Sequence, residues 1–208
     1  MKRVLILFAH PALEKSRVHR RLVASAKRVS GVTVHDLYQV YPDFDIDVAR
    51  EQALLTEHDI VVMQHPIYWY STPALLKQWQ DLVLEHGWAY GTGGNALRGK
   101  FLFSAVSAGG GEQAYSDVGL NGRTVRTFLA PIEQTARLCG VRYAPPFLVH
   151  GTHRLSDTEI DAEAARYAGT LEAVANGTLD LERVLHDDEL PRNLPAPSNG
   201  TPEARDAR

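Results

Sequence analysis

The chain has 208 residues, of which 44% are hydrophobic and 23% charged, with a formal net charge of −3. This length suits a single well-filled domain, and the slightly acidic balance argues against nucleic acid as a partner. Cys139 is the only cysteine, which excludes an intramolecular disulfide and a zinc site built from several thiolates.

Apolar runs alternate with helical periodicities along the chain. In order, they predict a strand at 4–9, a helix from its cap Ser16 to Gly31, a strand at 32–37 and a helix at 48–57. They continue with a strand at 59–64, a helix from Pro73 to 85, a strand at 100–106, and a helix at 123–138 with a potential kink at Pro131. A strand at 141–149, interrupted by two prolines, and a helix capped by Ser156 and ending near 175 complete the pattern.

This alternation predicts the architecture. Strands that alternate with helices imply a mostly parallel sheet with helices on both faces. Five strands favour a flavodoxin-like three-layer α/β fold with strand order 2-1-3-4-5 over a longer Rossmann sheet. Residues 186–208 are rich in proline and polar residues, so we expect a domain over 1–185 followed by a flexible tail.

Three loops follow predicted strands and should meet at one edge of the sheet, where open α/β sheets bind ligands. They are residues 10–19, 65–72 and 107–115. In the first loop, Ser16 begins a helix whose free backbone amides can bind an anion, with Arg17 or His19 adding charge. A phosphate suits this loop, although a capping serine beside solvated basic residues explains the same pattern.

The other two loops suit a flat ring. Residues 107–112 offer glycine backbone that amides can bring close to ring carbonyls and nitrogens, although consecutive glycines also form simple turns. Trp69 and Tyr70 either belong to the core or offer an apolar surface to a ring face, and their place in a loop favours the second. An isoalloxazine ring with its phosphate would use all three loops. No G-x-G-x-x-G motif follows the first strand, which argues against the usual Rossmann mode of dinucleotide binding.

Six motifs occur in order: LFAHP at 7–11, VTVHDLY at 32–38, YPDFDID at 41–47, HPIYWYSTPALLKQW at 65–79, HGWAYG at 86–91 and GGGE at 109–112. In this combination the chain resembles the flavodoxin-fold NAD(P)H:quinone oxidoreductases. Within them, it is most similar to the ancillary subunits of Kef-type glutathione-gated potassium efflux systems. The resemblance covers roughly residues 3–175, judged by motif order.

The resemblance implies FMN as the cofactor. It places four residues around the phosphate and ribityl chain, four along the ring and four at its polar edge. In that order they are His10, Ser16, Arg17 and Val18, then Pro66, Ile67, Tyr68 and Trp69, then Ser107, Ala108, Gly109 and Gly110. It also implies NAD(P)H as co-substrate, a quinone as acceptor, and a homodimer whose active sites combine residues of both subunits.

Tyr115 matches the position where these reductases place a tyrosine that faces the flavin carbonyl and the substrate. The mammalian-type reductases have a histidine six residues later, where this chain has Asn121. An amide donates hydrogen bonds but is no acid at neutral pH, which argues against a histidine proton relay here. We expect ping-pong hydride transfer, from NAD(P)H to flavin N5 and then to a quinone, with Tyr115 and Asn121 as catalytic residues that polarise the acceptor.

Two alternatives stay open. The chain could be an FMN-binding regulatory subunit of a glutathione-gated potassium efflux transporter, with little turnover of its own. Residues 38–47, which are aromatic and acidic, would then form a docking or dimer surface, or they simply pack. The chain could also carry electrons between proteins, although its small acidic surplus disfavours this function.

We expect no metal site, because no H-x-x-x-H or H-E-x-x-H motif occurs, and Cys139 should be packed rather than nucleophilic. The expected location is the cytoplasm. The apolar run at 4–9 is short for a signal peptide, and no segment approaches the roughly 18 apolar residues of a membrane span. A transporter partner would place the protein at the inner face of the cell membrane.

Overall fold

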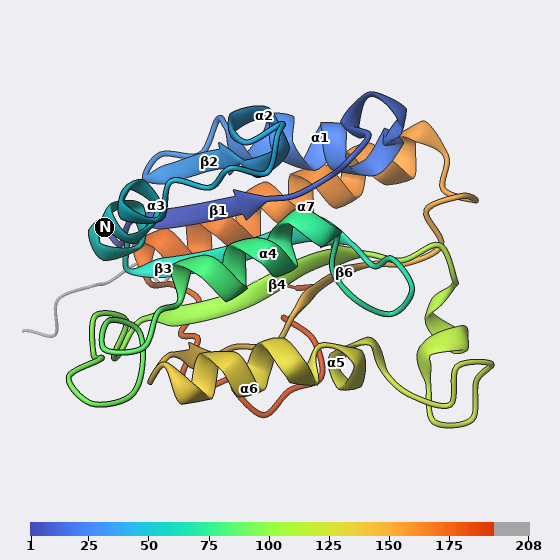
Figure 1. Ribbon diagram of the computed structural model, residues 1–208. Helices are drawn as coiled ribbons and strands as arrows, with labels where there is room; N and C mark the ends of the chain where they lie inside the picture. The colour runs from blue at the N-terminus through green and yellow to red at the C-terminus, as the bar shows by residue number, and fades with distance from the viewer. Residues whose placement is uncertain (194–208) are drawn as a thin grey trace, which may run out of the picture.

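One parallel sheet organises the chain. The structure, a computed structural model, describes residues 1–193, in which six strands pair in the order β2-β1-β3-β4-β5, with β6 also beside β4 (Figure 1). The strands are β1 Val4–Phe8, β2 Val32–Asp36, β3 Ile60–Pro66, β4 Phe101–Ser107, β5 Arg142–Tyr143 and β6 Phe147–Val149. The predicted strand order is confirmed. The predicted last strand is divided in two, because Pro145 and Pro146 lack the N–H groups that would continue the ladder.

Helices connect the strands. They are η1 Leu13–Lys15, α1 Arg17–Ala26, α2 Leu37–Val40, α3 Val48–Glu57, α4 Ala74–Val83, η2 Glu112–Tyr115, α5 Val125–Phe128, α6 Ala130–Leu138 and α7 Asp157–Asn176. α3 has the predicted limits, and α7 begins after the predicted cap Ser156, which forms a capping box with Glu159. Among residues 1–193, none of the helices combines the length and the hydropathy that a membrane crossing requires.

Two helical segments differ from the prediction. α1 ends at Ala26, well before Gly31, which instead lies in the turn before β2 with a φ of 80°. That left-handed conformation suits glycine and explains its place after the helix. The predicted helix at 123–138 is divided into α5 and α6, because Pro131 cannot continue a helix but fits the first turn of α6.

The helices form a layer on each face of the sheet, so the predicted three-layer arrangement is confirmed (Figure 1). Successive side chains of a strand point to opposite faces. Val4 and Ile6 of β1 therefore enter the core that α1 and α7 cover, whereas Leu5 and Leu7 enter the core beneath α3, α4 and α6. Because the sheet is covered on both sides, its inner strands β1, β3 and β4 are buried along their whole length.

The parallel strands bring their following loops to one end of the sheet (Figure 1). Pro66 at the end of β3 pairs with Ser107 at the end of β4, so the aromatic loop and the glycine loop begin side by side. Phe8 at the end of β1 pairs with Gln64 of β3, which brings the first loop to the same edge. The fold therefore gathers the three predicted ligand loops.

The first residues of the predicted tail pack against the domain. Leu190 is 1% exposed, belongs to the core beside α7, and its N–H donates to the Pro146 carbonyl at 2.9 Å. Burial of this leucine contributes to the packing of the segment on the domain. The flexibility of residues 186–193 stays a prediction, and the rest of the predicted tail lies outside the described residues. The domain limit at 185 stays a prediction.

Candidate functional site

A cleft of about 550 Å³ lies at the carboxyl end of the sheet, among the loops that follow β1, β3, β4 and β6. It brings together most of the predicted site residues, namely His10, Ser16, Arg17, Val18, Pro66, Ile67, Tyr68, Ser107, Gly109, Gly110 and Tyr115. Three predicted residues are not among those that line it: Trp69, Ala108 and Asn121.

The start of α1 forms one wall of this cleft. The Ser16 Oγ accepts the N–H of His19 at 3.0 Å and so caps the helix. The N–H groups of Arg17 and Val18, the first two residues of α1, have no intrahelical acceptor, and both residues line the cleft. These amides lie at the positive end of the helix dipole, so this wall can bind an anion such as a phosphate.

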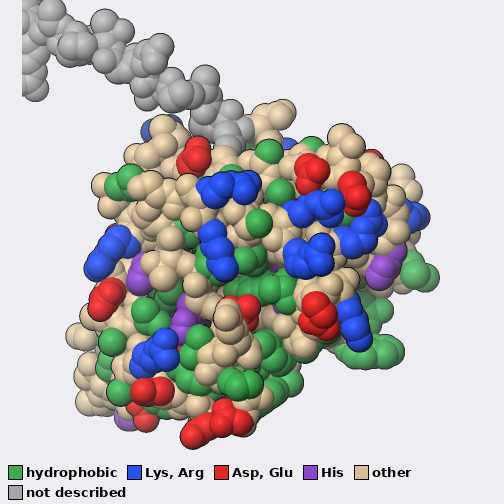
Figure 2. All heavy atoms as spheres, turned by 90° about the horizontal axis from the view of Figure 1, so that it is seen from above, with side chains coloured by type: hydrophobic (Ala, Val, Ile, Leu, Met, Phe, Trp, Pro, Cys, Tyr) green, Lys and Arg blue, Asp and Glu red, His purple; other side chains and the backbone are tan. Residues whose placement is uncertain are grey.

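The charges around this anion site differ from those predicted. The Arg17 guanidinium donates to Asp157 at 2.8 Å, and Figure 2 shows basic and acidic side chains side by side on the face that carries α1. His19 is buried, and burial, with His10 and His65 nearby, holds its pKa well below the ordinary value. His19 is therefore neutral, and the expectation that it adds charge is wrong. Lys15 is a further cation at the cleft.

His10 offers a hydrogen-bond donor to the cleft. The Ala12 N–H donates to His10 Nδ1 at 3.1 Å, which occupies that nitrogen as an acceptor. Burial lowers the pKa of His10, so the ring is neutral near pH 7 and carries its proton on Nε2. The ring lies at an angle of 73° to Tyr68, with 6.2 Å between the ring centroids. His10 can therefore donate from Nε2 to a ligand held beside Tyr68.

The aromatic loop makes a tight turn at the mouth of the cleft. The N–H groups of Tyr68 and Ser71 donate to each other's carbonyls at 3.1 and 3.0 Å. The two residues between them, Trp69 and Tyr70, have φ values of 49° and 62°, which are left-handed conformations. Tyr68 lines the cleft, but the turn directs Trp69 outward, where 93% of it is exposed. Trp69 is therefore not among the residues that line the cleft, and its predicted place along the ring stays a prediction.

The glycine loop is held close to two side chains. A Cβ at Gly109 would lie 2.8 Å from His153 Nε2, and a Cβ at Gly110 would lie 3.0 Å from Cε2 of Tyr115. A side chain at either position would therefore crowd one of these rings, and the bare glycine backbone faces the cleft. Ala108 lies behind this surface, because it is buried and its N–H donates to the Val149 carbonyl.

Of the two predicted catalytic residues, only Tyr115 lines the cleft, although the Asn121 N–H donates to the carbonyl of the neighbouring Ala114 at 2.9 Å. Tyr115, in η2, lines the cleft and also a neighbouring cleft of about 550 Å³. Burial and the nearby Tyr70 raise the pKa of Tyr115, so its hydroxyl stays protonated at neutral pH. Asn121 instead accepts a hydrogen bond from the Tyr70 hydroxyl at 3.2 Å. The rings beside Tyr115 are those of His150 and Phe128, with 5.8 and 6.2 Å between the centroids.

A fourth loop, which the sequence did not predict, also contributes to the cleft. Thr152 and His153, which follow β6, line the cleft together with Ala12 and Lys15 of the first loop. The signal was present, since residues after a parallel strand lie at the ligand edge of the sheet. The division of the predicted last strand obscured where that strand ends.

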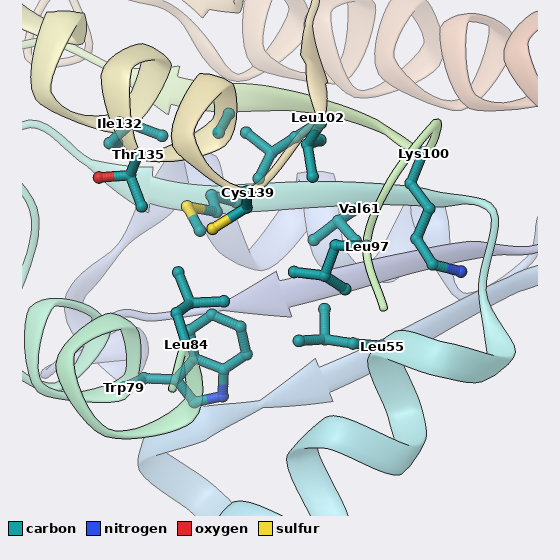
Figure 3. A pocket seen from close by; sticks show the side chains of 13 residues that line it. Leu55, Val61, Trp79, Leu84, Leu97, Lys100, Leu102, Ile132, Thr135 and Cys139 are labelled. Carbon is teal, nitrogen blue, oxygen red and sulfur yellow. The ribbon is translucent and has the colours of Figure 1, made fainter. Parts of the chain in front are cut away.

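A second cavity lies inside the core beneath α3, α4 and α6 (Figure 3). It measures about 30 Å³, is enclosed by Trp79, Leu84, Ile132, Cys139 and neighbouring apolar side chains, and is too small for a cofactor. Burial raises the pKa of the Cys139 thiol, which agrees with the predicted packed role. Within residues 1–193, no cluster of three or more histidine, cysteine or carboxylate side chains could hold a metal ion.

Comparison with known proteins identifies similar chains. The model of a family described by its flavodoxin-like fold matches residues 2–171. The glutathione-regulated potassium-efflux system ancillary protein KefF of Klebsiella aerogenes is 46% identical over 178 residues, which are 84% of this chain and 99% of that protein.

Two solved structures show the same arrangement of elements. The general stress protein 14 of Treponema denticola, solved in complex with FMN, superposes with a TM-score of 0.79 at 43% identity, covering 83% of this chain and 99% of that one. A protein of P. pentosaceus described as an NADPH-quinone reductase superposes with a TM-score of 0.73 at 32% identity, covering 83% and 97%.

Proposed function

The chain belongs to the family of flavodoxin-like fold, as its motifs predicted, and from this premise we propose that it is an FMN-dependent NAD(P)H:quinone oxidoreductase. The observation that carries the proposal is the cleft itself. It joins an anion site at the start of α1 to an aromatic wall and a bare glycine backbone at the ends of β3 and β4. FMN has the matching parts, which are a phosphate, a flat apolar ring and a polar ring edge.

The residues present fit this cofactor. The amides of Arg17 and Val18 would bind the phosphate, and Lys15 would add charge beside it. The protonated Nε2 of His10 and the backbone of Gly109 and Gly110 would donate to the polar atoms of FMN. The cleft volume of about 550 Å³ lies within the range of small-molecule sites, about 300–1,000 Å³.

FMN, when bound, would supply the chemistry by accepting a hydride from NAD(P)H and passing it to a quinone. The protein's part is to position the reactants and to stabilise charge. Tyr115 keeps its hydroxyl proton at neutral pH and can donate a hydrogen bond to an oxygen that becomes negative. Asn121 would act through Tyr70, which it holds at the mouth of the cleft.

The two substrates would use the same face in turn. Tyr115 lines both the cleft assigned to FMN and the neighbouring cleft, so a reactant that enters from that side would pass this residue. NAD(P)H must leave before a quinone can take its place, which gives a ping-pong cycle.

A second copy of the chain would complete this site. Trp69, Val118 and Leu120 are each more than nine-tenths exposed, although such large apolar side chains are usually covered. The hydrogen bond between Tyr70 and Asn121 joins the two segments that carry them, at the mouth of the cleft. We therefore expect a homodimer in which these side chains cover part of the partner's site.

The experiment is to add FMN to the purified protein, remove free flavin, and record the visible spectrum during addition of NADPH and then a soluble quinone. Flavin absorption that bleaches with NADPH and returns with quinone would support the oxidoreductase. Parallel double-reciprocal plots are expected, whereas intersecting plots would contradict the ping-pong cycle. Failure to retain flavin would overturn the cofactor assignment.

The alternative function is regulatory. The relative that carries the name of a potassium-efflux ancillary protein matches this chain along 99% of its own length, which favours a transporter partner at the inner face of the cell membrane. In residues 38–47, Tyr41 is buried and Phe44 is half-buried beside α4, whereas Asp43, Asp45 and Asp47 are exposed, so a docking surface here would be acidic rather than aromatic. Bound FMN without turnover, together with co-purification with a Kef-type transporter, would favour this alternative.

A further inference from the structure

A chain of four side chains runs from α7 to the cleft beneath the sheet edge. The Tyr167 hydroxyl lies 3.0 Å from Gln64 Oε1, Gln64 Nε2 lies 3.3 Å from His19 Nδ1, and His19 Nε2 lies 2.9 Å from Ser107 Oγ. All four residues are buried, and Ser107 alone also lines the cleft. Neither the cap of α1 nor the packing of the sheet requires this polar chain.

The direction of the hydrogen bonds follows from the Tyr167 end. A phenol has one proton, and among residues 1–193 Gln64 is the partner within reach of this hydroxyl. If the Gln64 amide were turned around, its NH2 group would face the Tyr167 oxygen and the buried phenol proton would have no acceptor, at considerable cost. The Tyr167 hydroxyl therefore donates to Gln64 Oε1, and burial raises its pKa, so the proton stays on the phenol.

The direction of the Tyr167–Gln64 hydrogen bond fixes the direction of the other two hydrogen bonds in this chain of side chains. The Gln64 NH2 group donates to His19 Nδ1, so the neutral His19 must carry its own proton on Nε2. That proton is donated to Ser107 Oγ, which occupies an oxygen lone pair. The hydroxyl proton of Ser107 then has to point elsewhere, and the side of Ser107 that is free of this chain is the cleft.

We propose that His19 is a positioning residue that fixes the Ser107 hydroxyl as a hydrogen-bond donor toward an acceptor atom of the ligand in the cleft. The ligand's identity as FMN rests on the function proposed above, and FMN presents oxygen and nitrogen acceptors. Without the chain, Ser107 could turn its proton inward and offer the ligand only a lone pair. Because the chain is buried, water does not compete for its members.

The first test needs no ligand. Nitrogen NMR of the ring of His19, assigned with His19→Phe, distinguishes a proton on Nε2 from one on Nδ1. The proposal expects the Nε2 form in the protein without FMN, and a shift toward the Nδ1 form in Tyr167→Phe, where the phenol proton no longer sets the direction. The Nδ1 form in the unaltered protein would overturn the proposal, whether or not FMN binds.

The second test measures FMN affinity by quenching of flavin fluorescence. Ser107→Ala should raise Kd by about tenfold, the value of one lost hydrogen bond. Tyr167→Phe, at a site away from the cleft, should also raise Kd. When Ser107 is already alanine, adding Tyr167→Phe should change Kd by less than twofold. The control is Ser104→Ala on the same strand, where the hydroxyl lies 2.9 Å from that of Tyr143 and should not influence FMN.

These tests separate the two levels of inference. Absence of FMN binding in the unaltered protein would overturn the proposed cofactor, while the NMR result would still decide the direction of the chain. Binding that Ser107→Ala leaves unchanged, or an equal loss with Tyr167→Phe in both backgrounds, would overturn the role of His19 and leave the cofactor in place. Circular dichroism and thermal melting of each variant show whether an effect on Kd comes from unfolding.

Discussion

The carboxylate of Glu51 shows how a single residue makes the stability of this fold depend on pH. It is buried between α3 and α4, where Oε1 accepts from His35 Nε2 at 2.8 Å and the Tyr41 hydroxyl at 2.6 Å, and Oε2 accepts from Trp79 Nε1 at 2.8 Å. Burial alone would raise the pKa of Glu51, but these hydrogen bonds bring it below its usual 4.5. The ionised group thus contributes stability that is present above pH 4.5 and lost as the pH falls through the folded pKa.

Glu51→Gln should therefore destabilise the protein. The amide cannot accept from all three donors, so one remains unsatisfied, and we expect a loss of about 2–4 kcal/mol in urea unfolding at pH 7. The loss of stability on acidification below pH 4.5 should also become shallower than in the unaltered protein. Glu57→Gln, at an exposed site on the same helix, should change stability by less than about 0.5 kcal/mol. An unchanged pH dependence in Glu51→Gln would contradict this account.

The hydroxyl of Tyr115, at the cleft, carries the next residue-level prediction. Tyr115→Phe removes the donor proposed for the developing negative oxygen but keeps the ring, so kcat/KM for the quinone should fall by about 10- to 100-fold. FMN affinity should change little, because the hydroxyl is assigned to the substrate. Tyr90→Phe, beside His86 and away from the cleft, serves as the matched control in stopped-flow measurements of flavin reoxidation. Equal rates in both variants would remove Tyr115 from the mechanism.

At the scale of elements, capping residues in the sequence correctly predicted helix limits, which depend on residues close together along the chain. The limits of α3 follow from the cap at Asp47, and those of α7 from the capping box at Ser156. The predicted positions of the strand ends identified most residues of the cleft, because parallel strands bring the loops that follow them to one edge of the sheet. The outward direction of Trp69 and the burial of His19 were missed, because both depend on tertiary contacts. Trp69 points outward because of the left-handed turn, and His19 is buried because it lies on the face of α1 that packs against the sheet.

The aromatic turn carries the prediction that belongs to this scale. Trp69 has a φ of 49°, a conformation that costs a side chain roughly 1 kcal/mol relative to glycine. Trp69→Ala and Trp69→Gly remove the same exposed ring, but only glycine relieves the backbone. The Gly variant should therefore be more stable than the Ala variant by about 1 kcal/mol in denaturant unfolding. The reverse order would show that the turn is not left-handed in solution.

At the scale of the whole molecule, the sheet explains why the site lies open at one end. Parallel strands are covered on both faces by α1 and α7 and by α3, α4 and α6, so a ligand can reach them only at the strand ends. The cleft at that end is bounded by segments whose apolar side chains remain uncovered, including Val118 and Leu120, at 98% and 92% exposed. A surface of this kind beside a site is where a second copy would bind.

Leu120→Asp tests this assembly. A charge on an apolar contact should raise the dimer dissociation constant by about tenfold or more, measured by sedimentation at several concentrations. Because each site would borrow residues from the partner, quinone turnover should fall with the fraction of dimer and recover as protein concentration rises. Leu138→Asp is the matched control, since this exposed leucine lies on α6, outside the cleft and its neighbour. Turnover that is independent of concentration in both variants would mean that one copy forms the whole site. The exposed side chain of Trp69 would then contact the substrate bound to its own copy of the chain.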